Sequence, residues 1–494
     1  MSDERPGPAE DVLAARRQKL ERLRKRGIEP FALRFDRDAT AAEVQEKFGS
    51  LAPEESSGQV VRVAGRLMAL RRLGKVTFGV LRDGSGDIQL FLSEESLEDY
   101  DVLEDLDLGD WVGAEGEVVR TKRGELSVRP SRIELMSKSL RPLPEKWHGL
   151  KDVELRYRRR YLDLATNPEV RERLAARARM LGALRSLLDA RGFVEVETPM
   201  LQPVPGGGLA TPFVTHHDAL GIPMYLRIAP ELYLKRLLVA GVERVYEIGR
   251  NFRNEGIAPK YNPEFTMLEA YQALASYEDM MDLVEALVKA AAEAAMRSTA
   301  FDFRGGRVDL AKPWRRATLM ELISEALGSA VDVDTPADEL RKSVEKAGMA
   351  ADPGWDSIRL LAEVFDKVVE PSLIQPTFVK DFPREISPLA RTHREDPRLA
   401  EHFDLVMGGV EIAPAYSELT DPDEQRRRFE MQKERARAGD QEAHPYDEEF
   451  LVALEHGMPP AGGLGLGIDR LLMVLTDAPS LREVILFPAL RPEE

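Results

Sequence analysis

Charged and aromatic side chains are concentrated in residues 247–271, EIGRNFRNEGIAPKYNPEFTMLEAY, which read as two strands joined by a loop. Because side chains alternate between the two faces of a strand, Arg253 and Glu255 are predicted to share one face of the first strand. One face of the second strand carries Phe265, Met267, Glu269 and Tyr271. Burying such charges together is costly without a partner, so the pattern indicates a ligand site. The alternative is a half-solvated strand pair with cross-strand charge pairs.

The strings RNFRNEG and NPEFTMLEAY resemble the second signature of class II aminoacyl-tRNA synthetases, in the form found in lysyl-tRNA synthetases. This resemblance implies that Arg253 grips the α-phosphate of ATP, that Glu255 reads the adenine amino group, and that Phe265 stacks on the adenine. It also implies ATP contacts from Tyr261 and Asn262 in the loop.

Three other segments are similar to the amino-acid pocket of the same family: the Gly-rich loop PVPGGGLATPF, the helix start APELYLKRL and the strand EIAPAYSEL. The resemblance implies that Glu231 binds the α-amino group of lysine and that Glu418 binds its ε-ammonium, with no cation of the chain competing nearby. For Glu231 the alternative is compensation of the helix dipole. The implied lysine-binding residues are Gly207, Glu231, Arg253, Glu269, Tyr271, Tyr416 and Glu418.

Pro414 departs from the family, because many lysyl-tRNA synthetases have asparagine at this place. The substitution predicts that one polar contact to the substrate is lost or replaced by water. Proline also lacks the N–H group that a central strand needs, so a bulge is expected here.

The remaining ATP contacts are implied by two more segments. Asp404 and Glu411 match the paired acids that hold Mg²⁺ on the phosphates, for which two carboxylates suffice. GGLGLGIDRLLMVLT resembles the third signature of the class, in which Arg470 takes the γ-phosphate and so joins Arg253 as a catalytic residue. Its alternating glycines are predicted to leave one strand face bare for the nucleotide. Further ATP contacts are implied for Glu411, Gly467 and Asp469. The spacing of Ser480 and Glu483 predicts a capping box.

The elements that precede these segments predict a nucleic-acid-binding part. Residues 60–135 alternate as five short strands with Gly-rich turns, which is typical of an oligonucleotide-binding barrel. Candidate tRNA contacts are Arg66, Phe78, Gln89 and Phe91, together with Arg71 and Arg72. Phe78 and Phe91 could instead belong to the barrel core. The helix predicted for residues 12–27 lies in a basic segment, with eight Lys or Arg against three Asp or Glu in residues 11–34. It faces either tRNA or solvent.

The fold class that follows is α+β: an N-terminal five-stranded barrel and a class II catalytic domain with an antiparallel sheet flanked by helices. The predicted divisions are a basic helical extension at 1–50, the anticodon-binding barrel at 51–140, a linker at 141–165, and the catalytic domain at 166–494. A helix at 169–191 resembles the first signature, which builds the dimer interface of the family. Residues 275–375 read mostly as helices, and we assign an insertion to about 290–375.

Composition limits the other possibilities. The 494 residues are 43% hydrophobic and 31% charged, and no apolar run approaches the roughly 18 residues of a membrane span. The absence of cysteine excludes disulfides, thiolate catalysis and Cys-ligated metals, and it fits a cytoplasmic location. The net charge of −17 has the wrong sign for an RNA-binding protein, so contacts with RNA must come from local basic patches.

The resemblance implies a homodimeric lysine–tRNA ligase that uses ATP, Mg²⁺, L-lysine and tRNA(Lys). Three alternatives remain open. A paralogue that lysylates a protein would resemble the catalytic domain alone. An aspartyl or asparaginyl synthetase would need a cation where Glu418 stands. A non-catalytic RNA-binding relative would not need the intact signature arginines and acids.

Overall fold

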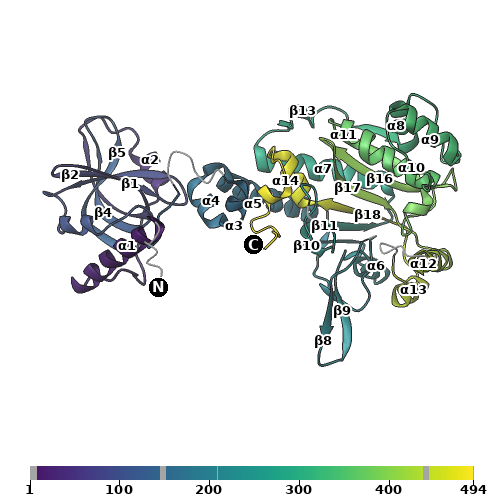
Figure 1. The fold of residues 1–494 in the computed structure, drawn as a ribbon, viewed down its shortest axis with the longest axis horizontal. Helices are drawn as coiled ribbons and strands as arrows, with labels where there is room; N and C mark the ends of the chain where they lie inside the picture. The colour runs from purple at the N-terminus through teal and green to yellow at the C-terminus, as the bar shows by residue number, and fades with distance from the viewer. Residues whose placement is uncertain (1–7, 145–151, 209, 257, 438–443, 493–494) are drawn as a thin grey trace, which may run out of the picture. The chain divides into compact units, whose positions relative to one another are not determined.

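A computed structural model of the chain describes residues 8–144, 152–208, 210–256, 258–437 and 444–492. The chain divides into two compact units, Met1–Lys151 and Asp152–Glu494, each with its own core (Figure 1). Part of the predicted linker, residues 145–151, lies outside the described residues. None of the described helices is both long and apolar enough to cross a membrane.

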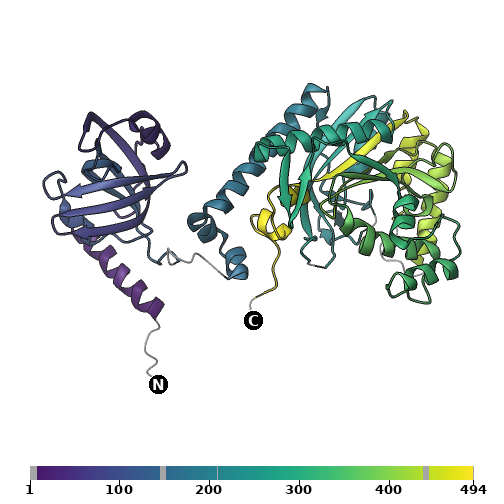
Figure 2. The ribbon, with the colours of Figure 1, turned by 90° about the horizontal axis from the view of Figure 1, so that it is seen from above.

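The first unit is built around a closed barrel with the strand order β1-β2-β3-β5-β4, whose strands curve around a common core (Figure 2). This confirms the predicted five-stranded barrel. On β3, every second residue is buried, so Ile88, Leu90 and Leu92 enter the core while Gln89 and Phe91 face outward. The strands are β1 (Ser56–Leu73), β2 (Val76–Arg82), β3 (Asp87–Ser93), β4 (Trp111–Arg120) and β5 (Leu126–Ser137), with a 3₁₀ turn η1 (Tyr100–Glu104).

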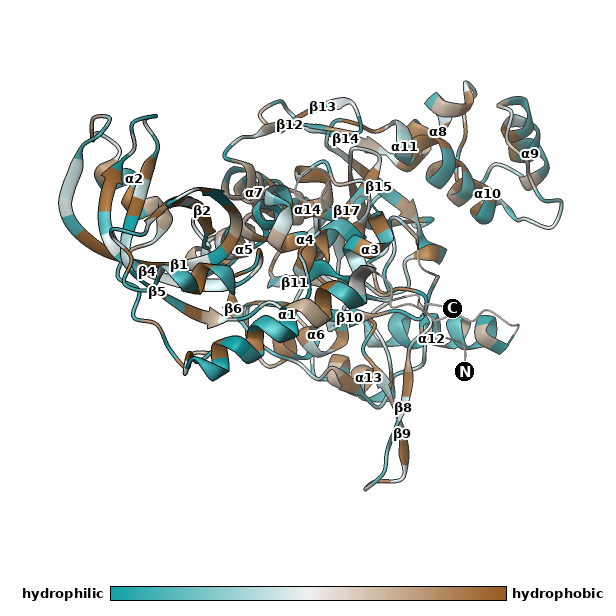
Figure 3. Cartoon of the chain, turned by 60° about the vertical axis from the view of Figure 1, so that its left-hand side comes forward, coloured by the Kyte–Doolittle hydropathy of each residue, from teal (hydrophilic) through white to brown (hydrophobic). Residues whose placement is uncertain are grey.

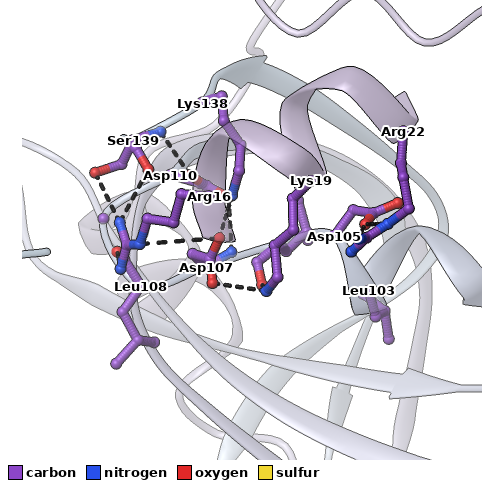
Figure 4. Close-up of polar contacts among 12 residues, drawn as sticks. Arg16, Lys19, Arg22, Leu103, Asp105, Asp107, Leu108, Asp110, Lys138 and Ser139 are labelled. Atoms are coloured by element: carbon purple, nitrogen blue, oxygen red, sulfur yellow. Dashed lines mark hydrogen bonds and ion pairs between the residues drawn. The ribbon is translucent and has the colours of Figure 1, made fainter. Parts of the chain in front are cut away.

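Two helices, α1 (Pro8–Lys25) and α2 (Ala41–Phe48), pack on the barrel. Helix α1 is mostly hydrophilic (Figure 3), yet several of its basic residues face the barrel rather than solvent (Figure 4). The Arg16 guanidinium donates to backbone carbonyls of Leu108, Ser139 and Arg141. Two ion pairs add to this contact: Lys19 with Asp107 at 2.7 Å, and Arg22 with Asp105 at 2.7 Å. Much of the basic charge of this helix is therefore used inside the first unit.

The second unit is built on an eight-stranded sheet in the order β14-β15-β16-β17-β18-β11-β10-β6. Its central neighbours are antiparallel, and only the pairs β14–β15 and β10–β6 are parallel. The predicted antiparallel sheet is thus confirmed. Its strands are β6 (Val194–Glu195), β10 (Arg244–Phe252), β11 (Glu264–Ala273), β14 (Arg315–Thr318), β15 (Thr377–Pro383), β16 (Leu399–Met407), β17 (Val410–Ser417) and β18 (Ala461–Gly467).

Helices α5 (Pro168–Ala190), α7 (Tyr277–Met296) and α14 (Ile468–Leu475) share one hydrophobic core with the sheet. Residues Leu268 and Ala270 of β11 enter this core. Because a strand alternates, their neighbours Met267, Glu269 and Tyr271 face the opposite side, where the cavities lie.

The remaining elements of the second unit surround this sheet. They are α3 (Val153–Arg158), α4 (Arg160–Thr166), β7 (Leu201–Gln202), β8 (Val214–His217), β9 (Ile222–Leu226), α6 (Glu231–Val239), β12 (Ala300–Phe303), β13 (Gly306–Asp309), α8 (Leu319–Leu327), α9 (Ala337–Lys346), α10 (Ser357–Val364), a π-helical turn η2 (Phe365–Val369), α11 (Glu370–Ser372), η3 (Arg384–Ile386), α12 (Pro422–Arg437), α13 (Glu448–Glu455) and α15 (Leu481–Val484).

The segment read as mostly helical contains helices α7 to α11, but strands β12, β13 and β14 interrupt it, and β14 joins the main sheet by pairing with β15. Two local predictions were wrong. Strand β10 ends at Phe252, so Arg253 and Glu255 lie in the following loop. Ser480 makes no side-chain cap, because Glu483 is instead held by the guanidinium groups of Arg156 and Arg173.

Lys138 provides a test of how the first unit is stabilised. Its side chain is fully buried, and its ammonium lies 2.6 Å from Asp107 and 2.8 Å from Asp110. We expect Lys138→Met to lower the free energy of unfolding by about 3 kcal/mol, because a buried carboxylate loses its counter-ion. The exposed pair Arg34–Asp36 gives a matched control, in which Arg34→Met costs less than about 1 kcal/mol. Urea unfolding, monitored by hydrogen exchange of the amides in β4, measures the free energy of unfolding of the first unit in both variants. Equal losses in Lys138→Met and Arg34→Met would contradict the prediction.

Candidate active site

Two cavities lie on the polar side of the main sheet, and they share part of their walls. The first, of about 360 Å³, contains Glu231 and Glu269 in its lining and is called the glutamate cavity. The second, of about 370 Å³, contains Arg470 and is called the arginine cavity. Both cavities are lined by Arg253, Met267, Glu411 and Pro414.

The arginine cavity brings together every residue predicted to contact ATP. The Arg253 guanidinium carbon lies 5.2 Å from the centre of the Phe265 ring, and that of Arg470 lies 5.6 Å from the Tyr261 ring. These stacked pairs give two flat surfaces that carry positive charge. The predicted residues in its lining are Arg253, Glu255, Tyr261, Asn262, Phe265, Glu411, Gly467, Asp469 and Arg470.

Two of these residues also hold the protein itself together. Asp469 is buried, and it accepts hydrogen bonds from the backbone N–H of Thr266 at 2.7 Å and from Arg177 at 2.6 Å. The amide of Asn262 donates to the carbonyl of Glu264 at 2.5 Å. Both side chains therefore fix β11 and the loop before it, whatever they contact in a bound ligand.

The glutamate cavity collects six of the seven residues predicted to bind lysine: Gly207, Glu231, Arg253, Glu269, Tyr271 and Tyr416. Glu418 is buried and does not line it. Its carboxylate is paired with the ammonium of Lys235, which also lies 2.6 Å from Glu231. The expectation that no cation of the chain competes for Glu418 was therefore wrong.

The carboxylates of this cavity accept hydrogen bonds from tyrosine hydroxyls, and burial acts on two of the acidic groups. Tyr416 donates to Glu231 at 2.5 Å, and Tyr271 donates to Glu269 at 3.1 Å. Burial raises the pKa of Glu269 to about 8, and the charge of Glu231 adds to this effect. Burial also raises the pKa of Glu418 to about 8, although Lys235 acts in the opposite direction. For Lys235 the two carboxylates outweigh burial, so its pKa is raised and it stays charged.

Gly207 and His444 form a contact that sequence patterns did not indicate. The backbone N–H of Gly207 donates to His444 Nε2 at 2.9 Å, so the other ring nitrogen carries the proton and donates to the Pro445 carbonyl at 2.7 Å. Burial lowers the pKa of His444 and keeps it neutral. Gly207 has a φ of +87°, and a Cβ there would lie 2.7 Å from that of Glu231, so only glycine fits.

Asp404 and Glu411 both line the glutamate cavity, and Glu411 reaches the arginine cavity as well. Burial raises the pKa of Asp404, His402 at 3.2 Å lowers it, and the charge of Glu411 raises it further. A divalent cation would relieve this repulsion between the carboxylates. Within the described residues, no group of three or more acidic or histidine side chains could hold a metal alone. Any such ion would need oxygen atoms from a ligand.

The signature glycines and Pro414 differ partly from their predicted roles. Gly463 does not face a nucleotide, because Glu418 and the Tyr271 ring fill the space where its Cβ would lie. Only Gly467 lines the arginine cavity. The bulge expected at Pro414 lies earlier in β17: Pro414 pairs with Asp404, and the register shifts between the pairs Leu405–Ala413 and Val406–Glu411. Pairing of β17 with β18 begins at Ala415. The missing N–H of Pro414 therefore lies outside that ladder.

A third cavity, of about 720 Å³, lies on the barrel of the first unit and is lined by Phe78, Gln89 and Phe91. The two rings stack with centroids 5.4 Å apart and are not part of the barrel core. The cavity does not contain Arg66 or Arg72, because Arg66 donates to the Gly109 carbonyl and Arg72 to the Leu103 carbonyl. Its basic lining residues are Arg71, Arg120, Lys122, Arg123 and Arg129.

Protein-family models match both units of the chain. A model described as tRNA synthetases class II (D, K and N) matches residues 152–491. A model described as an OB-fold nucleic acid binding domain matches residues 61–136.

Whole-length similarity points to the same group. The chain is 52% identical over 486 residues to a Lysine--tRNA ligase of Moorella thermoacetica, and the match covers 98% of each chain. It is 52% identical over 488 residues to the protein of the same name from Pelotomaculum thermopropionicum, covering 98% of this chain and 96% of the relative. The corresponding protein of Thermosynechococcus vestitus is 49% identical over 493 residues, covering 98% and 97%.

The raised pKa of Glu269, about 8 against an ordinary 4.5, predicts how stability depends on pH. The folded protein binds this proton more tightly than the unfolded chain, so the stabilisation is complete below about pH 4.5 and is lost as pH rises through 8. We expect the free energy of unfolding of the ligand-free protein, obtained from urea titrations, to fall between about pH 5 and 8, by up to about 1.4 kcal/mol per pH unit for this group. In Glu269→Gln the free energy of unfolding should fall less steeply with pH, because the titrating carboxyl group is absent. Glu264→Gln, an exposed position on the same strand, serves as the control. A Glu269→Gln slope equal to wild type would contradict the assignment.

Proposed function

The chain belongs to the class II tRNA synthetases, within the family of lysine–tRNA ligases, and from this we propose how its cavities divide the reaction. The protein activates L-lysine with ATP and transfers the lysyl group to the 3′ end of tRNA(Lys). Lysine occupies the glutamate cavity and ATP occupies the arginine cavity.

The observation that carries this proposal is the position of Arg253, which lines both cavities. A guanidinium at their shared wall can contact the carboxylate of an amino acid and the α-phosphate of ATP together. The acidic lining on one side suits an amino acid with ammonium groups. An aspartyl specificity is disfavoured, because Glu231 and Glu269 provide no cation for an anionic side chain.

The reaction needs no nucleophile from the protein. A carboxylate oxygen of lysine forms a bond to the α-phosphorus of ATP while the bond to pyrophosphate breaks, giving lysyl-adenylate. A ribose hydroxyl of the tRNA terminus then attacks the lysyl carbonyl, and AMP leaves. The chain contributes orientation and charge stabilisation, with Arg253 at the α-phosphate and Arg470 toward the γ-phosphate.

Mg²⁺ fits the paired carboxylates of Asp404 and Glu411, whose mutual repulsion favours a cation between them. Bound there, it would neutralise charge on the phosphates of ATP. Glu411 also lies 3.1 Å from Arg470, so the same carboxylate helps to orient the arginine toward the phosphates.

The barrel cavity is proposed to hold the tRNA anticodon. Its stacked rings offer a surface for bases, and its basic lining residues supply positive charge that a chain of net charge −17 needs locally to bind RNA. Lys122 and Arg123 are exposed, and neither has an ion-pair partner among the described residues.

We further propose that the protein is a cytoplasmic homodimer. Several large apolar side chains near the predicted first signature are exposed in the single chain, and others lie on the β8–β9 hairpin (Figure 3). Burial of such a surface against a second copy would remove it from water. The exposed residues are Val194, Met200, Leu201, Val214, Leu220 and Ile222.

Pyrophosphate exchange with each of the twenty amino acids tests the assignment of substrate. We expect exchange with lysine, and Glu269→Gln should reduce kcat/KM for lysine by the equivalent of about 2–5 kcal/mol, because a buried ammonium loses its partner. KM for ATP should change little, since Glu269 lines only the glutamate cavity. Glu264→Gln is again the control. Efficient exchange with another amino acid but not with lysine would refute the function.

Phe78 separates tRNA binding from amino-acid activation. Phe78→Ala removes one stacking surface, worth about 1–3 kcal/mol per base, so kcat/KM for tRNA charging should fall by about 5- to 150-fold. Exchange with lysine should remain unchanged. Phe31→Ala removes an exposed aromatic ring of the same unit that does not line the cavity, and should leave charging intact. Unchanged charging in Phe78→Ala would mean that bases bind elsewhere.

A further inference from the structure

Lys235 is fully buried in the second unit and lies in direct contact with two carboxylates. It follows Glu231 by one helical turn on α6, and Glu418 reaches it from the residue just after the end of β17. The Tyr416 ring centre lies 5.3 Å from its ammonium, and the Phe450 ring centre of α13 lies 5.9 Å away. Because its ammonium is enclosed by these groups, Lys235 is a fixed structural part of the site.

Among the described residues, Lys235 is the sole cationic side chain that forms an ion pair with Glu418. Both oxygens of Glu418 are buried and accept no hydrogen bond there, although one forms the ion pair. Glu231 uses a single oxygen for Lys235 and for the Tyr416 hydroxyl, and the residue itself lines the cavity. The Lys235 ammonium therefore links Glu418, which lies behind the cavity wall, to Glu231, which lines the cavity.

The charges around the glutamate cavity match a particular kind of substrate. Apart from Asp404 and Glu411, which the proposed Mg²⁺ would neutralise, three carboxylates lie in or behind its wall, those of Glu231, Glu269 and Glu418. Lys235 and Arg253 provide two cations. The sum for these five groups is one negative charge when all are ionised. An amino acid with two ammonium groups and one carboxylate carries one positive charge and completes the balance, whereas a neutral side chain leaves a carboxylate unpaired.

We infer that Lys235 is a positioning residue that fixes the carboxylates of Glu231 and Glu418 and sets the cavity charge for a substrate with two ammonium groups. This inference rests on the proposed function, because it explains how the same cavity selects lysine. The pKa values of Glu269 and Glu418 agree with it, since burial raises both and the charge of the neighbouring Glu231 raises them further. The groups that face Lys235 are Glu231 on its own helix, Tyr416 on β17, Glu418 just after that strand, and the neutral His444.

The test uses Lys235→Met in the full-length protein, with pyrophosphate exchange at varied lysine, ATP and pH. We expect KM for lysine to rise at least about 30-fold, because the carboxylates lose their fixed partner and hold protons more tightly. KM for ATP should stay within about twofold. For the same reason the pH dependence of kcat/KM for lysine should move to higher pH, which a simple loss of packing would not cause.

Lys289→Met is the matched control. Lys289 follows Glu285 at the same spacing on α7, with its ammonium 2.6 Å from the carboxylate, but it lies far more exposed. It should leave both KM values and the pH profile unchanged. If KM for lysine in Lys235→Met stays within about threefold of wild type, or rises together with KM for ATP, the inference is overturned.

A second variant keeps the test decisive if Lys235→Met does not fold, as thermal unfolding would reveal. Lys235→Met/Glu418→Gln removes one charge of each sign, and should retain a raised KM for lysine with a pH profile near that of wild type. A KM for lysine near wild type in this variant would overturn the inference. A wild-type protein that shows no exchange with lysine would instead refute the proposed function.

Discussion

The alternation of side chains along the central strands governs the second unit. On β11, one set of residues packs beneath α5, α7 and α14, and the other set faces the cavities. A shift of one residue would move Glu269 into the hydrophobic core and Leu268 into the cavity. The register of β11 therefore cannot change without disrupting both the core and the cavity. Strand β18 pairs with β11 over its whole length, and its glycines leave room for the side chains that β11 presents.

Each unit contains a buried lysine that pairs with two carboxylates, but the consequences differ between the units. In the first unit Lys138 is paired with Asp107 and Asp110, and the network serves to hold the barrel and α1 together. In the second unit Lys235 is paired in the same manner, yet the carboxylates near it exceed the cations and part of the group lines a cavity. A buried cluster that is balanced stabilises a fold, and one that is unbalanced next to a cavity creates a requirement for a ligand.

Local patterns predicted much of the fold, because strand alternation, Gly-rich turns and helix-terminal residues act over short distances. The barrel, strand β11 and the helix after Pro230 are examples. Contacts distant in the sequence were harder to foresee. Glu483 was assigned to a helix cap, but arginines from α3 and α5 compete for it. Lys235 carried a usable signal, the four-residue spacing from Glu231, whereas its pairing with Glu418 depends on tertiary packing. All the residues predicted to contact ATP line the arginine cavity, and they were found through their resemblance to known signatures rather than through physical patterns; Lys260, Thr266, Ile412 and Leu481 also line it and were not predicted.

The central place of β18 has a consequence for synthesis of the protein on the ribosome. This strand, residues 461–467, lies between β17 and β11, so the main sheet stays divided until almost the whole chain has been made. The barrel needs no residue beyond the first unit and can fold while translation continues. Until the final segment emerges, the nascent catalytic unit exposes two unpaired strand edges, which makes it a natural client for chaperones and a target for proteolysis.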